Sequence, residues 1–153
     1  MLKSWMMHIK WERRLDMIRE IVTDPILLSR KSLPANKKDI QIIHDLLDTI
    51  AANSDRCVGM AANMIGECKT ILVALIGNEF IPMVNPKIID KSKQVYESKE
   101  GCLSLIGTRK TIRHEMITVE YLDKKFKRKK QIFRGLEAKI IQHELDHFQG
   151  ILI

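Results

Sequence analysis

The sequence predicts one globular domain that combines helices with strands, and three observations support this prediction. The chain has 153 residues, which is too few for two full domains but enough to bury a core without disulfide support. Apolar residues recur at helical spacing in two segments, one beginning near residue 36 and one near the C-terminal end. Short β-prone segments lie between them, and no repeat or Pro/Gly/Ser linker marks a second domain.

The first helix is predicted to run from about Asn36 to about Asn53. Asn36 is a suitable N-cap, and Asp39 follows it three residues later. One face of this helix should pack inward, because apolar residues recur at Ile40, Ile43, Leu47 and Ile50. His44 has no partner at ligand spacing on the same turn, so we leave it out of the predicted site.

Four short β-prone segments make the middle of the domain mostly sheet. They span residues 70–76, 81–84, 87–89 and 116–122. Turn-forming residues separate them, namely Gly77, Asn78, Pro82, Asn85 and Pro86.

The last helix is predicted from about Leu136 to Gln149, after Gly135 and before Gly150. Two apolar stripes run along it, one made of Leu136, Ile140, His143 and His147, the other of Ile141, Leu145 and Phe148. A helix that is apolar on two faces should lie buried at the centre of the domain.

The net charge of +7 arises from 26 Lys and Arg against 19 Asp and Glu, and much of it lies between Lys124 and Lys130. Short β-prone runs flank these cations, so a solvated hairpin turn is the simpler interpretation. A weak contact with a polyanion such as RNA or the ribosome is the alternative. Only Phe126 interleaves the cations and aromatic residues are 5% of the chain, which argues against nucleic-acid binding as the main activity.

Composition also indicates the compartment. The chain has no run of about 18 apolar residues that could span a membrane, and its first eleven residues lack the features of a signal peptide. The cysteines are odd in number and have no CxxC spacing, which argues against a disulfide framework and a zinc finger. We therefore expect a cytoplasmic protein without membrane contact.

His143, Glu144 and His147 form an HExxH motif in the last helix. Four residues correspond to about 400° of rotation, so both imidazoles lie on one side and can bind one divalent ion. Glu144 is displaced by about 100° from His143, which places its carboxylate beside a water molecule near the ion rather than among the ligands. Two core histidines without a metal are the alternative. Burying them with a carboxylate would be costly, so we favour a site for metal-assisted hydrolysis.

A third protein ligand is expected upstream of this helix. In the HExxHxxGxxH pattern Gly150 fits, but the last histidine would fall at Ile153. The upstream candidates are the three cysteines, His44, His114 and several carboxylates.

Cys102 stands out among these candidates. Gly101 before it allows a close backbone approach, and the residue after it can direct its N–H at the centre. Cys57 and Cys68 are more simply small buried hydrophobes. A thiolate with two imidazoles suits Fe2+, Zn2+, Ni2+ or Co2+ and leaves a position open for water.

The chain resembles the peptide deformylase family in three motifs that occur in the family's order. They read Val58-Gly59-Met60-Ala61-Ala62-Asn63-Met64-Ile65-Gly66, then Glu100-Gly101-Cys102-Leu103-Ser104, then Gln142-His143-Glu144-Leu145-Asp146-His147. The second and third match completely. The resemblance implies an α+β fold with antiparallel β-sheets around the central HExxH helix. It also implies removal of the formyl group from the N-terminal formyl-methionine of nascent polypeptides, with release of formate.

The resemblance further assigns roles at the metal centre. Cys102, His143 and His147 would hold one divalent ion, commonly Fe2+, with Zn2+, Ni2+ or Co2+ as substitutes. Glu144 would be the general base and would later return its proton to the leaving amine. The backbone N–H of Leu103 would donate to the oxyanion.

Other positions would support the centre or contact the substrate. Arg113 would anchor Glu100 behind the metal ligands. Gly59 and Met64 of the first motif would lie at the substrate.

The first motif departs from the family pattern. Met64 stands where the family has a Gln that donates a hydrogen bond to the formyl oxygen, and a thioether has no hydrogen to donate. Losing one oxyanion donor costs about 10²- to 10³-fold in rate, so we expect a slow enzyme. Cys57 and Asn63 also replace the usual Gly and Pro, and the Asn63 amide is a candidate substitute donor. The alternative is a divergent paralogue that binds metal and formyl- or acyl-peptides but is non-catalytic or has an altered substrate.

The resemblance covers residues 17–153, which we predict to be a single peptide-deformylase-like domain. Residues 1–16 are then an N-terminal extension or the result of a mis-called start.

Overall fold

The computed structural model describes residues 18–153. The prediction for residues 1–16 lies outside the described residues. Within 18–153, every helix is too short or too polar to cross a membrane.

The helices and strands have the following bounds. The helical elements are α2 (Pro25–Leu28), the 3₁₀ turn η1 (Lys37–Asp39), α3 (Ile40–Ala52), the 3₁₀ turn η2 (Ala62–Ile65) and α4 (Gly135–Phe148). The strands are β1 (Gly59–Ala61), β2 (Ile71–Ile76), β3 (Glu79–Lys91), β4 (Val95–Cys102), β5 (Leu105–His114), β6 (Met116–Leu122) and β7 (Arg128–Arg134).

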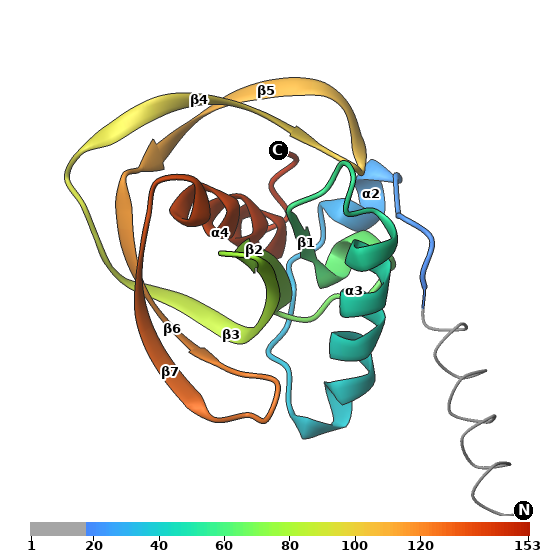
Figure 1. The fold of residues 1–153 in the computed structure, drawn as a ribbon. Helices are drawn as coiled ribbons and strands as arrows, with labels where there is room; N and C mark the ends of the chain where they lie inside the picture. The colour runs from blue at the N-terminus through green and yellow to red at the C-terminus, as the bar shows by residue number, and fades with distance from the viewer. Residues whose placement is uncertain (1–17) are drawn as a thin grey trace, which may run out of the picture.

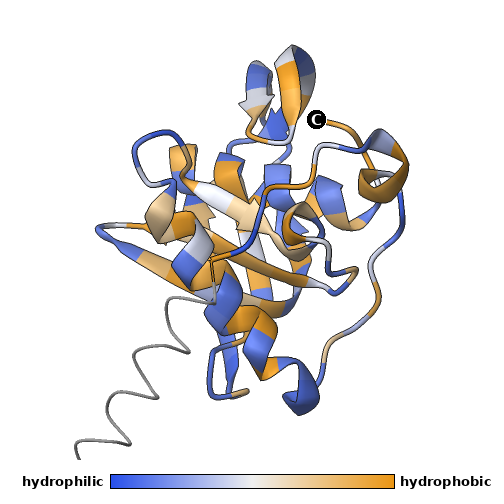
Figure 2. Cartoon of the chain, turned by 90° about the vertical axis from the view of Figure 1, so that its right-hand side faces the viewer, coloured by the Kyte–Doolittle hydropathy of each residue, from blue (hydrophilic) through white to orange (hydrophobic). Residues whose placement is uncertain are grey.

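Two antiparallel sheets curve around α4 (Figure 1). One has five strands in the order β1-β2-β3-β6-β7, and the other is the β4–β5 hairpin. The arrangement confirms the predicted α+β fold with a central helix. Hydrophobic and hydrophilic residues are interspersed along most strands and helices (Figure 2). Strand β2 is the exception, since it is apolar throughout and its residues 71–74 are fully buried.

The close packing of β1 on α4 depends on a glycine. A Cβ added to Gly59 would lie 2.7 Å from Ile140 Cγ2 and 3.0 Å from Glu144 Oε2. Only a residue without a side chain lets this strand approach the helix beside Glu144.

The first predicted helix is present, but it begins with a different turn. Asn36 and Asp39 form a capping box around η1, and the α-helix proper starts at Ile40. The prediction of separate strands at 81–84 and 87–89 is wrong, because both belong to β3. The register shifts between Val84 and Lys87, and Asn85 adopts a φ of 50°, so a bulge carries the strand across the predicted break.

The cationic segment lies on the predicted hairpin, between β6 and β7. Asp123 Oδ1 accepts hydrogen bonds from the backbone N–H groups of Lys125 (2.8 Å) and Lys127 (3.0 Å), which closes the turn. All six cations of Lys124–Lys130 are exposed.

The start of α4 and the β4–β5 hairpin differ from the prediction made from the sequence. Leu136 was expected in the buried stripe of the last helix, but it lies in the first turn of α4 and is 66% exposed. Strands β4 and β5 were not predicted, since much of their length is polar and exposed.

Candidate metal centre and pocket

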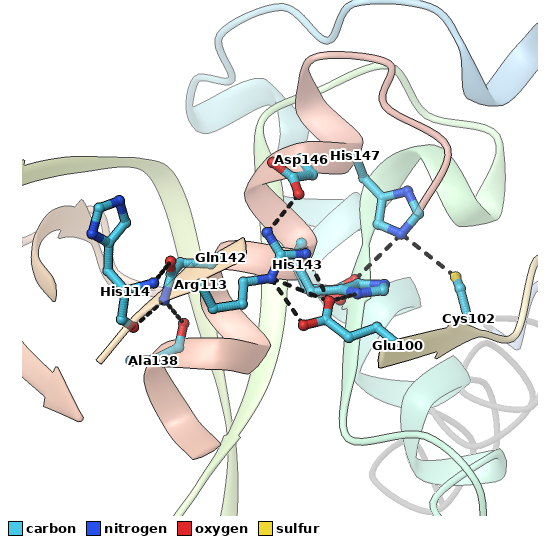
Figure 3. Close-up of polar contacts among 10 residues, drawn as sticks. Glu100, Cys102, Arg113, His114, Ala138, Gln142, His143, Asp146 and His147 are labelled. Atoms are coloured by element: carbon cyan, nitrogen blue, oxygen red, sulfur yellow. Dashed lines mark hydrogen bonds and ion pairs between the residues drawn. The ribbon is translucent and has the colours of Figure 1, made fainter. Parts of the chain in front are cut away.

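Three potential metal ligands converge where the end of β4 meets α4 (Figure 3). The ligand atoms of Cys102, His143 and His147 all lie within 4.8 Å of one another. Cys102 Sγ is 3.5 Å from His147 Nε2. Among the residues that the structure describes, no other group of three His, Cys, Asp or Glu side chains converges in this way.

The backbone places these side chains. The i, i+4 spacing in α4 puts both imidazoles on the side that faces β4, and His147 is fully buried. Cys102 ends β4 at a register shift after Gly101, so the thiol is displaced from the regular pairing of the hairpin.

A buried ion pair between Arg113 and Glu100 lies next to the potential ligands. Arg113 donates from Nη2 to Glu100 Oε1 at 2.7 Å and from Nε to Glu100 Oε2 at 2.9 Å. It also donates from Nη1 to Asp146 Oδ2 at 2.7 Å, which ties β5 to α4. The predicted Arg113–Glu100 contact is therefore present, whereas the contact with Asp146 was missed. Asp146 belongs to the HExxH segment, but nothing in its spacing points to an arginine 33 residues upstream.

Glu100 also orients one of the potential ligands. His143 Nδ1 lies 2.8 Å from Glu100 Oε1, so its N–H donates to the carboxylate and Nε2 is the ring nitrogen available to a metal ion. Although burial opposes it, the hydrogen bonds from His143 and Arg113 hold the pKa of Glu100 well below its usual range. The carboxylate is therefore charged and can hold the imidazole in place.

Glu144 lies beside the ligands, as the helical geometry predicts. It is 2% exposed, and its Oε1 is 3.8 Å from His147 Nε2 and has no hydrogen-bond partner among residues 18–153. Burial raises its pKa to about 7. Burial and the charge of His143 lower the pKa of His147 to about 3, so this imidazole is neutral and can act as a ligand.

The donor set fits a divalent metal ion. Burial disfavours a charge on His143, yet its hydrogen bonds to Cys102 and Glu100 and the nearby Glu144 carboxylate raise its pKa to about 10. The thiol and carboxylates thus favour positive charge at this point, which a divalent cation would supply. One thiolate and two imidazoles suit a borderline ion such as Fe2+ or Zn2+.

A pocket of about 240 Å³ opens beside this centre. Cys102, His143, Glu144 and Leu103 are in its wall, together with Gly59 of the first motif. Its apolar lining includes Val58, Met64, Leu136 and Ile140. Of the predicted site residues, Arg113 and His147 do not line the pocket, and all the others do. The predicted role of the Leu103 N–H stays a prediction.

The first-motif segment presents no side-chain amide to this pocket. Met64 is 1% exposed and its thioether packs in the core beside the pocket. Asn63 Nδ2 donates to the backbone oxygens of His147 (3.2 Å) and Leu28 (3.5 Å). The suggestion that Asn63 replaces the missing donor is therefore wrong, because its amide group donates to backbone oxygens near the ends of α2 and α4.

The other ligand candidates lie outside the centre. Cys57 Sγ donates to Gly59 O at 2.9 Å, and burial, together with the charge of Glu144, raises the pKa of its thiol to about 12. His44 is exposed on α3, and His114 Nδ1 interacts with the backbone oxygen of Ser92 at 2.7 Å. Cys68 is half-buried and is not part of the converging group.

Antiparallel sheets around an HExxH helix, with a thiol beside the two imidazoles, define a metallohydrolase. Polypeptide deformylase is the family whose model matches the chain, over residues 18–153. The chain therefore belongs to the polypeptide deformylase family, as its motifs predicted.

Relatives and solved structures agree with this assignment. The chain is 56% identical to a peptide deformylase of Clostridium beijerinckii over 137 residues, which cover 90% of this chain and 100% of that protein. The crystal structure of peptide deformylase from Thermotoga maritima superimposes with a TM-score of 0.80 at 26% identity, covering 88% of this chain and 94% of that one. A class I type b peptide deformylase from Acinetobacter baumannii gives a TM-score of 0.79 at 27% identity, covering 88% and 95%.

Proposed function

We propose that the chain hydrolyses the formamide C–N bond of N-terminal formyl-methionine in nascent polypeptides, with Cys102, His143 and His147 as its metal ligands. Family membership supports the deformylase activity. The observation that carries the assignment of ligands is the convergence of their donor atoms within 4.8 Å in the wall of a pocket that also contains Glu144.

The metal proposed is Fe2+, with Zn2+, Ni2+ or Co2+ as substitutes. When bound, it would polarise the formyl carbonyl and make a water molecule more acidic. Glu100 and Arg113 would hold His143 in the orientation that ligation requires.

Glu144 is proposed to transfer a proton from a water molecule to the leaving amine. Its Oε1 has no hydrogen-bond partner among residues 18–153, so it can accept a proton from a water molecule in the pocket. After the C–N bond breaks, the same carboxyl group would return this proton to the leaving amine nitrogen. The Leu103 backbone, next to Cys102 in the pocket wall, would donate its N–H to the oxyanion.

We expect turnover to be slow because Met64 offers no donor to the formyl oxygen. The test is formate release from formyl-methionyl peptides by protein purified without oxygen, with elemental analysis of its metal. Met64→Gln should raise kcat/KM by about 10²- to 10³-fold.

Met60→Gln is the matched control, since Met60 is buried in the same segment but does not line the pocket. It should lower stability without raising the rate. If wild type and Met64→Gln both release no formate while binding metal, the alternative holds: a paralogue that binds metal and formyl- or acyl-peptides without turnover.

We also propose a cytoplasmic location for this protein and a weak contact of Lys124–Lys130 with RNA or the ribosome. The support is the exposure of the six cations on one hairpin. Binding to ribosomes should fall with salt and with charge reversal of the hairpin. Binding that is insensitive to both would contradict this contact.

A further inference from the structure

Three cations lie around the mouth of the catalytic pocket. Arg56 precedes β1, Lys99 lies in β4 and Lys139 lies in α4, so the three come from different segments of the chain. Arg56 and Lys99 are exposed, and Lys139 is half-buried. Within residues 18–153, none of the three forms an ion pair.

The carboxylates of the pocket do not neutralise this mouth. Glu100 is 4% exposed and is already bound by Arg113 and His143. Glu144 is 2% exposed and lies deep in the pocket beside His147. Among the residues that line the pocket, the more exposed charges are therefore positive, whereas the acidic groups are buried beside the metal centre.

The interior of the pocket has a different character from its mouth. Ile140 and Met64, which are 6% and 1% exposed, line it with apolar groups, which suit an apolar side chain such as that of methionine. The residues that follow an N-terminal formyl-methionine would then lie at the mouth, near the three cations.

We propose that this mouth selects formyl peptides with a carboxylate in the first two residues after formyl-methionine. This inference rests on the proposed function and adds a substrate preference to it. Exposed ion pairs typically change affinity by roughly 1.5- to 5-fold each, so three cations should give about a tenfold preference in total. Salt should weaken the preference, because the cations act through solvent.

The experiment compares three C-terminally amidated peptides, formyl-Met-Glu-Ala-Ser, formyl-Met-Gln-Ala-Ser and formyl-Met-Lys-Ala-Ser. For wild type, kcat/KM should follow the order Glu, Gln, Lys, and the differences should shrink at about 1 M salt. The double variant Arg56→Glu, Lys99→Glu should reverse the order. Lys93→Glu, which makes the same type of charge change at an exposed position outside the pocket, should leave it unchanged.

Two further arms separate the possible outcomes. The first compares kcat/KM of the dipeptide formyl-Met-Gln with a free C-terminal carboxylate and with an amidated C-terminus. A higher value for the free acid would support recognition of a carboxylate at this distance from formyl-methionine, and equal values would count against it. Turnover of the Gln peptide at the same rate as the Glu and Lys peptides would overturn the preference and leave the deformylase activity intact. If no peptide is turned over, the proposed function fails, and calorimetric Kd values of the Glu and Lys peptides then decide the preference: equal values overturn it.

Discussion

The two walls of the pocket use their polar groups in different ways. On the wall formed by β4 and α4, the ligand group faces the centre and is held by partners, since Glu100 fixes His143 and Arg113 fixes Glu100. On the wall formed by residues 57–66, the polar groups are occupied by the protein itself. Cys57 donates to Gly59 O and Asn63 donates to His147 O.

This difference indicates that metal binding and contact with the substrate oxygen are separable. The first depends on side-chain contacts between β4, β5 and α4, whereas the 57–66 segment is joined to α4 at the backbone oxygen of His147. Changes on the first wall should therefore alter the metal content, and changes on the second wall should alter the rate or the stability.

Cys102→Ala should have the largest effect. The remaining two imidazoles bind a divalent ion weakly, so the protein should lose stoichiometric metal and deformylation should fall to the background. Cys57→Ala is the matched control. It removes another thiol from the wall of the same pocket, but this thiol is hydrogen-bonded to the backbone oxygen of Gly59. Metal content measured by elemental analysis checks this, and equal metal loss in both variants would contradict the assignment of Cys102.

Glu144→Gln should retain the metal but lose the proton acceptor. We expect kcat to fall by about 10²- to 10⁴-fold, the usual contribution of a general base. Formate release per bound metal ion is the measurement. A rate near that of wild type would show that another group accepts the proton.

Arg113→Met should weaken metal binding by about 10- to 100-fold, because Glu100 and Asp146 lose their common partner and His143 loses its fixed orientation. Competition with a chelator gives the affinity. Arg109→Met, on the same strand but without an ion pair among the described residues, should have a much smaller effect. Similar losses in both variants would argue against the anchoring role.

Asn63→Ala should act on stability. It removes hydrogen bonds to the backbone oxygens of His147 and Leu28, which should lower the free energy of unfolding by about 1–3 kcal/mol. Urea unfolding measures this change. A fall of about 10²-fold in kcat with unchanged stability would instead indicate that Asn63 contacts the substrate.

Local patterns predicted several elements well. The prediction for the strand at 116–122 agrees with β6, and the last helix is shifted by only one residue at each end. Both have a regular period and clear turn signals at their ends. The β4–β5 hairpin escaped prediction because its buried side chains include Glu100 and Arg113, which are polar and find their partners in each other and in α4.

The sequence by itself determined the relation between His143, Glu144 and His147, because backbone hydrogen bonds set the rotation per residue of a helix. It also indicated the class of metal through the types of donor atom. Only the tertiary structure decided that Cys102 meets the two imidazoles, that Arg113 reaches Asp146, and that Asn63 is directed at α4. These contacts join residues between 33 and 84 positions apart in the sequence. Whether residues so far apart meet depends on how the sheets close around the helix, and no local period of the sequence shows this.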